Sequence, residues 1–216
     1  MRSKEQRCTL VNLLSNLING ISLGSVYAII ALGYTMVYGI AKMLNFAHGD
    51  VIMVGAYSAM LAITSLKLPP IVAVILAMLV CTLLGIIIEA LAYRPLRQAS
   101  SLAVLITAIG VSYFLQNMAL LLWGSNPRSF PKIIDLPSIR LFDGKLVITW
   151  ATLLTIVVCI VVMIGLTVFT RHSKMGKAMR AVSEDKGAAE LMGINVNVTI
   201  SVTFAIGSAL AAIAGV

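Results

Sequence analysis

Length, composition and charge together indicate a membrane protein. The chain has 216 residues, of which 60% are hydrophobic and 11% charged, with a mean hydropathy of +1.01, whereas about a quarter of a soluble domain is charged. The net charge of +8 does not indicate nucleic-acid binding, because the basic residues stand between apolar runs and no basic face carries interleaved aromatics.

Six apolar runs follow one another along the chain. Crossing a bilayer takes about 20 residues of helix, and lipid offers the backbone no partners except its own, so each run is expected to be a helix. The predicted fold class is all-α, a polytopic membrane helical bundle forming a single transmembrane domain over 1–216. The runs cover roughly residues 10–38, 47–66, 69–92, 101–123, 148–170 and 197–216.

The first run follows a basic start, Met1 to Arg7, as in a signal peptide. It continues well past the roughly 7–15 apolar residues of a cleavable core, so we expect a retained span. Within it, Gly20-Ile21-Ser22-Leu23-Gly24 matches the G-x-S-x-G pattern of a serine nucleophile. Ser22 with His48 would make an intramembrane serine protease, but no strand precedes the motif. Small residues that let two helices approach closely are the simpler explanation, as at Gly207-x-x-x-Ala211.

A polar stretch begins the second run and contains Asn45, His48 and Asp50. Ionisable groups at such a depth are costly, which makes these three residues candidates for a substrate path. The alternative is a solvated connection in which Asn45 and Asp50 cap the next helix. If every run spans, the basic N-terminus lies on the other side from the later basic loops. Either the N-terminus is outside, or segment 39–66 is re-entrant.

Two connections are long, at roughly 124–147 and 171–196. Pro127, Pro131 and Pro137 predict an irregular conformation for the first. The charge-dense second contains a segment, 171–194, that we interpret as a docking element. Met175, Met179 and Val182 form a helical apolar stripe beside a basic face, Gly187 interrupts the helix, and a small-residue piece ends at Gly193. This composition fits either a groove on another protein or anionic lipid, and the small residues favour the protein groove.

Motifs for chemistry on this chain are missing from the sequence. It has neither H-E-x-x-H nor G-x-x-x-x-G-K-[ST], and Cys8, Cys81 and Cys159 have no metal-site or disulfide spacing. We therefore expect no catalytic residue, metal or cofactor here, and no use of ATP except through another chain. Glu89 is expected to reach Arg94 near the membrane interface.

Several motifs together resemble the branched-chain amino acid ABC-transporter permeases of the LivH type. Ala188-Ala189-x-x-x-Gly193 looks like the end of the EAA–glycine signature of importer permeases, with Gly187 in place of its glutamate. The other motifs are Asn45-Phe-Ala-His-Gly49, Tyr93-Arg-Pro-Leu-Arg97, Thr107-Ala-Ile-Gly-Val111, Gly176-Lys-Ala-Met-Arg-Ala181 and Leu191-Met-Gly-Ile194.

The resemblance implies a multi-pass subunit of the bacterial inner membrane that imports branched-chain or related amino acids. Its partners would be a second homologous permease, ABC ATPase subunits that bind ATP, a periplasmic substrate-binding protein and membrane lipid. It also implies that 171–194 is a cytoplasmic coupling segment. The residues expected to couple to the ATPase are Gly176, Met179, Arg180, Ala181, Ala188, Ala189 and Gly193.

Two further expectations concern completeness and alternatives. The chain stops at Val216 inside an apolar run, whereas the family it resembles continues through further helices, so a C-terminal truncation is expected. A stand-alone secondary transporter or channel, with His48 and Asp50 in its path, is the alternative function. Branched-chain amino acids, amides and urea are not distinguished as substrates by the sequence.

Overall fold

The computed structural model describes residues 2–97, 99–130, 139–141 and 146–216. In chain order they form α1 (Arg2–Ala41), α2 (His48–Thr64), α3 (Pro70–Ile88), a π-helical turn (Glu89–Tyr93), a 3-10 turn (Arg94–Leu96), α4 (Ser101–Trp123), β1 (Ile139–Leu141), β2 (Leu146–Ile148), α5 (Trp150–His172), α6 (Lys174–Glu184), α7 (Lys186–Leu191) and α8 (Val196–Gly215). The predicted all-α bundle is confirmed. The antiparallel pair β1–β2 is an addition, within a connection predicted to be irregular.

Five helices in the described part are long and apolar enough to cross a membrane: Asn12–Ala41, Pro70–Leu96, Ser101–Trp123, Trp150–His172 and Val196–Gly215. Each coincides with one of the predicted runs. The remaining run corresponds to α2, which has 17 residues and is about 26 Å long at the α-helical rise. Many apolar side chains on these helices are exposed, including Leu121 at 81% and Ile71 at 76%, as suits surfaces that face lipid.

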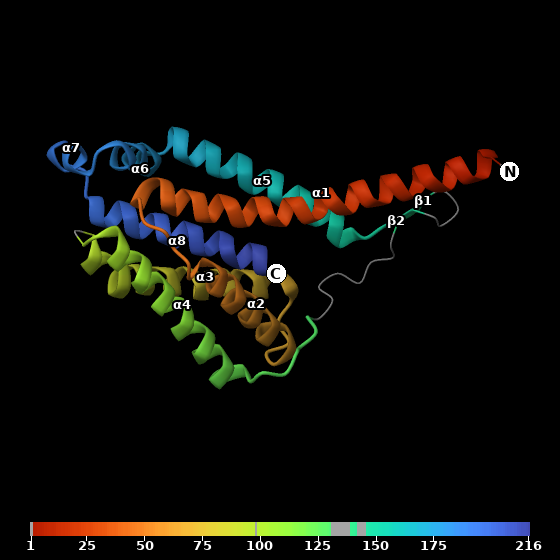
Figure 1. Cartoon of the computed structure of the whole chain (residues 1–216), viewed down its shortest axis with the longest axis horizontal. Helices are drawn as coiled ribbons and strands as arrows, with labels where there is room; N and C mark the ends of the chain where they lie inside the picture. Colours follow the sequence, from red (N-terminus) through yellow and green to blue (C-terminus); the bar gives the residue numbers. More distant parts are fainter. Residues whose placement is uncertain (1, 98, 131–138, 142–145) are drawn as a thin grey trace.

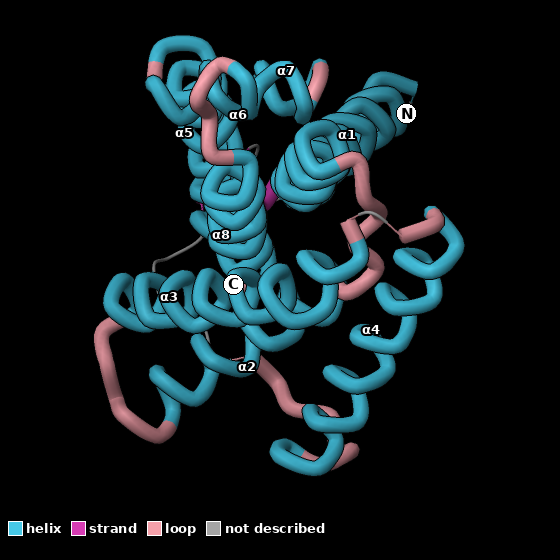
Figure 2. Tube along the Cα trace, turned by 90° about the vertical axis from the view of Figure 1, so that its left-hand side faces the viewer, coloured by secondary structure: helices cyan, strands magenta, loops and turns pink. Residues whose placement is uncertain are grey.

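The helices form layers around α8. Figure 1 shows α1 and α5 on one side of α8, α2 and α3 on the other, and α4 outermost beyond them. Figure 2, at right angles, shows α8 at the centre and α4 standing apart from it. The core therefore lies where α1, α2 and α3 pack on α8.

Glycines let these helices approach α8 closely. A Cβ atom added at Gly55 would lie 2.9 Å from Cα of Ala212, and one added at Gly207 would lie 2.8 Å from Cγ2 of Val37. The expectation of close packing at Gly207 is confirmed. Gly20 and Gly24, by contrast, have nothing within 4 Å, so these two glycines make no such contact within the described chain.

The two ends of the molecule differ. The N-terminus lies at one end and α6 and α7 at the other, and the long helices alternate in direction between them (Figure 1). Of the two topologies left open by the sequence, the fold has the N-terminus opposite the coupling segment. The connection from α1 to α2 nevertheless turns back into the bundle (Figure 1), and Asn45, Ala47 and His48 are buried there.

Candidate functional site

The coupling segment begins with α6, which is fixed to the bundle by one face. The Ser173 hydroxyl caps the helix by accepting from the Gly176 N–H at 2.8 Å. Met179 and Val182 are each 1% exposed, and Met175 packs on the same core. The apolar stripe expected from the sequence therefore exists, but it contacts this chain's own helices and is not free for a partner.

Gly176 is required by the sharp turn between α5 and α6. A Cβ atom at this position would lie 2.5 Å from the backbone oxygen of Phe169 and from backbone atoms of Thr170. No side chain fits there without moving α6 away from α5. Gly176 thus sets the angle at which α6 leaves the membrane-spanning helix.

The second helix, α7, starts at a different residue from the one the sequence suggested. The interruption is Asp185, whose backbone is extended at φ −147° and ψ 117°. Its carboxylate accepts from the N–H groups of Gly187 at 2.8 Å and Ala188 at 3.1 Å. Gly187 therefore lies inside α7 and does not separate the two helices. Asp185 separates them, because its side chain caps the start of α7.

The end of α7 is closed by Gly193, as predicted. Gly193 has φ +78°, a left-handed conformation that glycine adopts at little cost. Its N–H donates to Glu190 O at 2.9 Å, and the N–H of Ile194 donates to Ala189 O at 3.0 Å. This pair of bonds is the Schellman motif, which satisfies the last carbonyls of a helix. The tip of α7 is therefore held in a defined shape.

The predicted coupling residues divide between two roles. Arg180, Ala188 and Gly193 are exposed and Ala181 is half-buried, while Gly176, Met179 and Ala189 are buried against the bundle. Leu191 and Met192, 90% and 83% exposed, stand at the tip and were not among the predicted site residues. The sequence does contain a signal for Leu191 and Met192: they are two large apolar residues in a charged segment, directly before the glycine that ends the helix.

Lys186 connects α7 to the end of α1. Its ammonium donates to Ala41 O at 2.9 Å, and Ala41 is the last residue of α1. A cation there satisfies a terminal carbonyl and the negative end of the helix dipole. Burial, and then the charges of Arg97 and Lys42, lower the pKa of Lys186, so its position beside Ala41 is a costly one.

The end of α3 carries a buried polar network. Glu89 is fully buried and forms an ion pair with Arg97, which also donates to Asn197. Ser201 on α8 donates to the second oxygen of Glu89 at 2.6 Å. The sequence suggested Arg94 as the partner of Glu89. Arg97 takes that place because the 3-10 turn after Tyr93 carries the chain back toward α8.

Asn45 and His48 are both buried at 4% exposure, but they face different neighbours. The Tyr93 hydroxyl donates to the Asn45 side-chain oxygen at 3.0 Å. The His48 ring meets Tyr34 edge-on, with centroids 6.1 Å apart. In the described part of the chain its Nε2 has no hydrogen-bond partner. Asn45 does not cap α2, because the residue before α2 is Ala47 and makes no side-chain cap.

Asp50 faces a third neighbour, helix α4. It is 7% exposed, and its carboxylate accepts from the Ser112 hydroxyl and, at 3.1 Å, from the Gln116 amide. The three substrate-path candidates therefore lie at or just before the start of α2, but they face the π-helical turn after α3, helix α1 and helix α4, respectively. Within the described residues they do not gather around one cavity. Their role in a path remains a prediction.

The protease interpretation is not supported by the geometry. Within the described chain, His48 packs beside Gly33, and Ser22 lies three helical turns earlier on α1, about 16 Å away along the axis. A nucleophile and its base must be within hydrogen-bond reach. Nor do the described residues place three His, Cys, Asp or Glu side chains where they could hold a metal ion.

The fold and the site define a multi-pass helical membrane protein with an ordered, partly exposed helical segment at one end. Comparison with known proteins gives the particular family. Residues 16–216 match the family model "Branched-chain amino acid transport system / permease component", and the chain belongs to this family.

Curated relatives agree with the family match. The chain is 46% identical over 215 residues to the high-affinity branched-chain amino acid transport system permease protein BraD of Pseudomonas aeruginosa, covering 94% of this chain and 69% of the relative. It is 42% identical over 221 residues to LivH of Escherichia coli K12, with the same coverages. A probable LivH of Methanocaldococcus jannaschii is 29% identical over 196 residues, which cover 87% of this chain and 60% of the relative. No solved structure matches the chain.

Proposed function

We propose that this chain is the membrane-spanning permease subunit of an ABC importer for branched-chain amino acids in the bacterial inner membrane. The family membership and the membrane-spanning helices support the role of permease. The observation that carries the ABC mechanism is the tip of α7. There Leu191 and Met192 are almost fully exposed on a segment whose opposite face is packed on the bundle.

The exposed tip suits a protein groove. Exposing two large apolar side chains to water is unfavourable. Burying them against a partner protein would be favourable by about 25 cal/mol per Å² of apolar surface removed from water. The Asp185 cap and the Gly193 closure keep these side chains in place before binding, which lowers the entropic cost of docking. We expect Arg180 and Ala188, also exposed, to lie at the edge of the same contact.

The partners follow from this assignment. We infer that ATP is bound by two ATPase subunits on other chains, that a second homologous permease completes the membrane part, and that a periplasmic binding protein delivers substrate. ATP binding would move α6 and α7 together with the bundle and shift the permease pair between its access states. Branched-chain amino acids are the substrates named for the relatives, and we propose the same class here, ahead of amides and urea.

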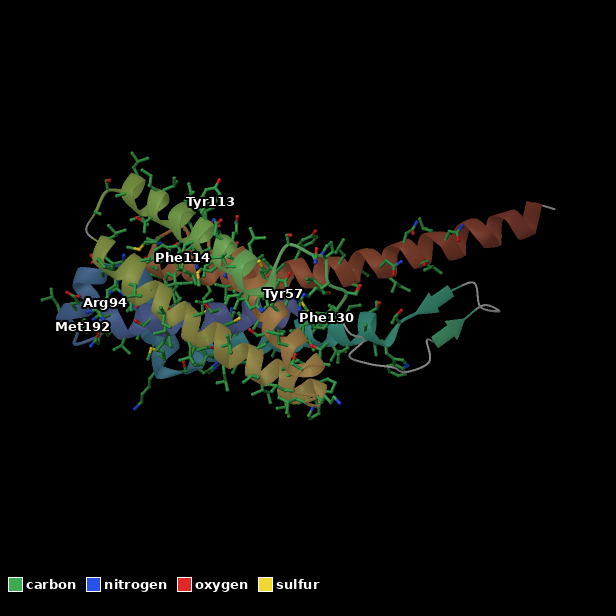
Figure 3. All side chains as sticks on the ribbon, turned by 90° about the horizontal axis from the view of Figure 1, so that it is seen from below. Tyr57, Arg94, Tyr113, Phe114, Phe130 and Met192 are labelled. Atoms are coloured by element: carbon green, nitrogen blue, oxygen red, sulfur yellow. The ribbon has the colours of Figure 1, made fainter. Side chains whose placement is uncertain are left out.

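Co-expression with the ATPase subunits tests this function. Leu191→Asp with Met192→Asp should abolish co-purification of the ATPase and ATP-dependent leucine uptake, because charges at a buried apolar contact are strongly unfavourable. Phe130→Asp is a matched control: Phe130 is also exposed but lies toward the other end of the molecule from Met192 (Figure 3). Uptake that persists without any ATPase would instead establish a stand-alone transporter.

A further inference from the structure

Among the residues whose burial the structure describes, two acidic side chains are buried between helices, and one of these two is paired with a cation. Glu89 is 0% exposed and is ion-paired with Arg97, whereas Asp50 is 7% exposed and has two neutral partners, Ser112 and Gln116. Within the part of the chain that the structure describes, no Lys, Arg or His side chain lies within 4.0 Å of the Asp50 carboxylate. Glu89 is thus a buried acid whose charge a cation balances, and Asp50 is a buried acid with neutral partners.

A buried carboxylate without a cation is energetically costly. Two hydrogen bonds and the first turn of α2, where the helix dipole favours negative charge, offset part of that cost. They do not cancel the charge. Ionisable groups retained inside a membrane bundle generally mark a ligand or ion path. A carboxylate has about four lone-pair positions, and Ser112 and Gln116 occupy one on each oxygen, so each oxygen can still accept another donor.

Gln116 links the buried Asp50 carboxylate to the exposed side of α4. Gln116 is exposed although it lies in the middle of a spanning helix. Its side-chain nitrogen donates to Asp50 at 3.1 Å and to the Ser112 hydroxyl at 3.1 Å, so polar atoms extend from the buried carboxylate to the exposed side of α4. In Figure 2, α4 stands apart from α8, so Ser112 and Gln116 belong to an outer helix of the described bundle.

The position of α4 does not depend on Asp50 alone. Two turns along both helices, Tyr57 of α2 stacks on Trp123 of α4, with ring centroids 4.6 Å apart and an interplanar angle of 5°. This stack is a second tie between α2 and α4. If Asp50 served only to hold α4 against α2, it would repeat the function of the Tyr57–Trp123 stack.

We propose that Asp50 is the counter-charge for the α-ammonium group of the amino acid that passes through the permease, and that Ser112 and Gln116 orient its carboxylate. This inference rests on the proposed function and names the chemistry of one contact within it. An ammonium carries three donors and the missing positive charge, so it complements the two free acceptor positions. The branched side chain of the substrate adds only apolar surface, which the bundle already offers.

Uptake by the whole reconstituted importer tests this contact. Asp50→Asn should lower leucine uptake by about tenfold to a hundredfold, the value of a hydrogen bond to a charged group, while the ATPase still co-purifies. Asp50→Glu should retain more uptake than Asp50→Asn. The double variant Ser112→Ala, Gln116→Ala should lose much less uptake, because the carboxylate and the Tyr57–Trp123 stack remain. Asn117→Ala is the control, because the Asn117 amide donates to the Tyr113 carbonyl of its own helix.

A second variant keeps the test decisive if Asp50→Asn does not assemble. Gln116→Lys places an ammonium beside Asp50 and should block uptake in a fully assembled complex. Gln116→Met, of similar length and uncharged, removes only the orienting amide and should lower uptake no more than the double alanine variant does. If Asp50 only held α4 in place, Gln116→Lys would preserve uptake and the double alanine variant would match Asp50→Asn; either result overturns the proposal. It is also overturned if uptake requires sodium in the wild type but not in Asp50→Asn, because an inorganic cation would then occupy the site. Wild-type uptake that needs ATP keeps the proposed function intact in each case.

Discussion

At the scale of single residues, Lys186 adds a polar contact between the coupling segment and the end of α1 to the apolar packing of α6 on the bundle. Its ammonium donates to the last carbonyl of α1, and the next residue, Lys42, turns the backbone to φ +57°. From there the chain enters the buried connection that contains Asn45. A movement of α7 would therefore pull on the end of α1, where the polar connection that contains Asn45 begins.

Replacing Lys186 by Met should uncouple the two parts without detaching the ATPase. The exposed tip of α7 is unchanged, so the ATPase should co-purify normally. Leucine uptake per ATP hydrolysed should fall about fivefold, as expected from losing a bond of roughly 1 kcal/mol. Lys186→Arg keeps a donor for Ala41 O and should retain most of the coupling. Lys177→Met, an exposed lysine on α6, controls for loss of charge. Equal losses in Lys186→Met and Lys177→Met would mean that the contact with Ala41 has no part in coupling.

At the scale of elements, α8 is the helix on which the bundle is assembled, and small residues on its neighbours determine how closely they pack. Gly85 of α3 lies directly against the Ser208 side chain, with Phe204 O close by; an added Cβ would lie 3.1 Å from that oxygen. Helix α8 also carries Ser201, whose hydroxyl donates to Glu89 in the π-helical turn that follows α3. The close packing at Gly85 and the hydrogen bond between Ser201 and Glu89 therefore both require the same axial position of α3 against α8.

Enlarging Gly85 should separate the two helices. Gly85→Leu forces a side chain into Ser208, and overpacking of this kind costs about 1–3 kcal/mol or more. The melting temperature of the detergent-solubilised chain should fall clearly. Gly110→Leu makes the same substitution in spanning helix α4, where nothing lies within 4 Å of an added Cβ, and should leave the melting temperature near the wild-type value. A similar melting temperature for both variants would show that α3 and α8 do not meet at Gly85.

The elements that could be predicted from the sequence are those determined by one strong local signal. Apolar length located the spans, and Gly193 located the end of α7 because only glycine readily adopts its φ. A stripe such as Met179 and Val182 shows that a helix buries one face, but not whether its own bundle or a partner covers that face. The directions of Asn45, His48 and Asp50 likewise depend on which helices pack around α2, and that is tertiary information.

At the scale of the whole molecule, basic charge alone does not orient the chain. Arg2, Lys4 and Arg7 precede the first span at one end of the fold, while the coupling segment and the turn with Arg94 and Arg97 are basic at the other. Figure 3 places Arg94 and Met192 at the same end. Short basic loops favour the cytoplasm at either end, so the two signals conflict. The proposed function decides between them: if the coupling segment meets an ATPase, it lies in the cytoplasm, where ATP is.

Cysteine labelling in a cysteine-free background should therefore place the N-terminus in the periplasm. Cysteines introduced at Ser3, in the first turn of α1, and at Ser125, two residues after α4, should react with a membrane-impermeant maleimide in intact spheroplasts. The start of α1 and the end of α4 both lie away from α6 and α7 (Figure 1). A cysteine at Lys177 should react only after permeabilisation. Protection of Ser3→Cys together with labelling of Ser125→Cys would mean that α1 does not cross the membrane in the direction the fold requires. The Lys177→Cys result bears separately on the ATPase assignment, since labelling from outside would place the docking tip where no ATPase can reach it.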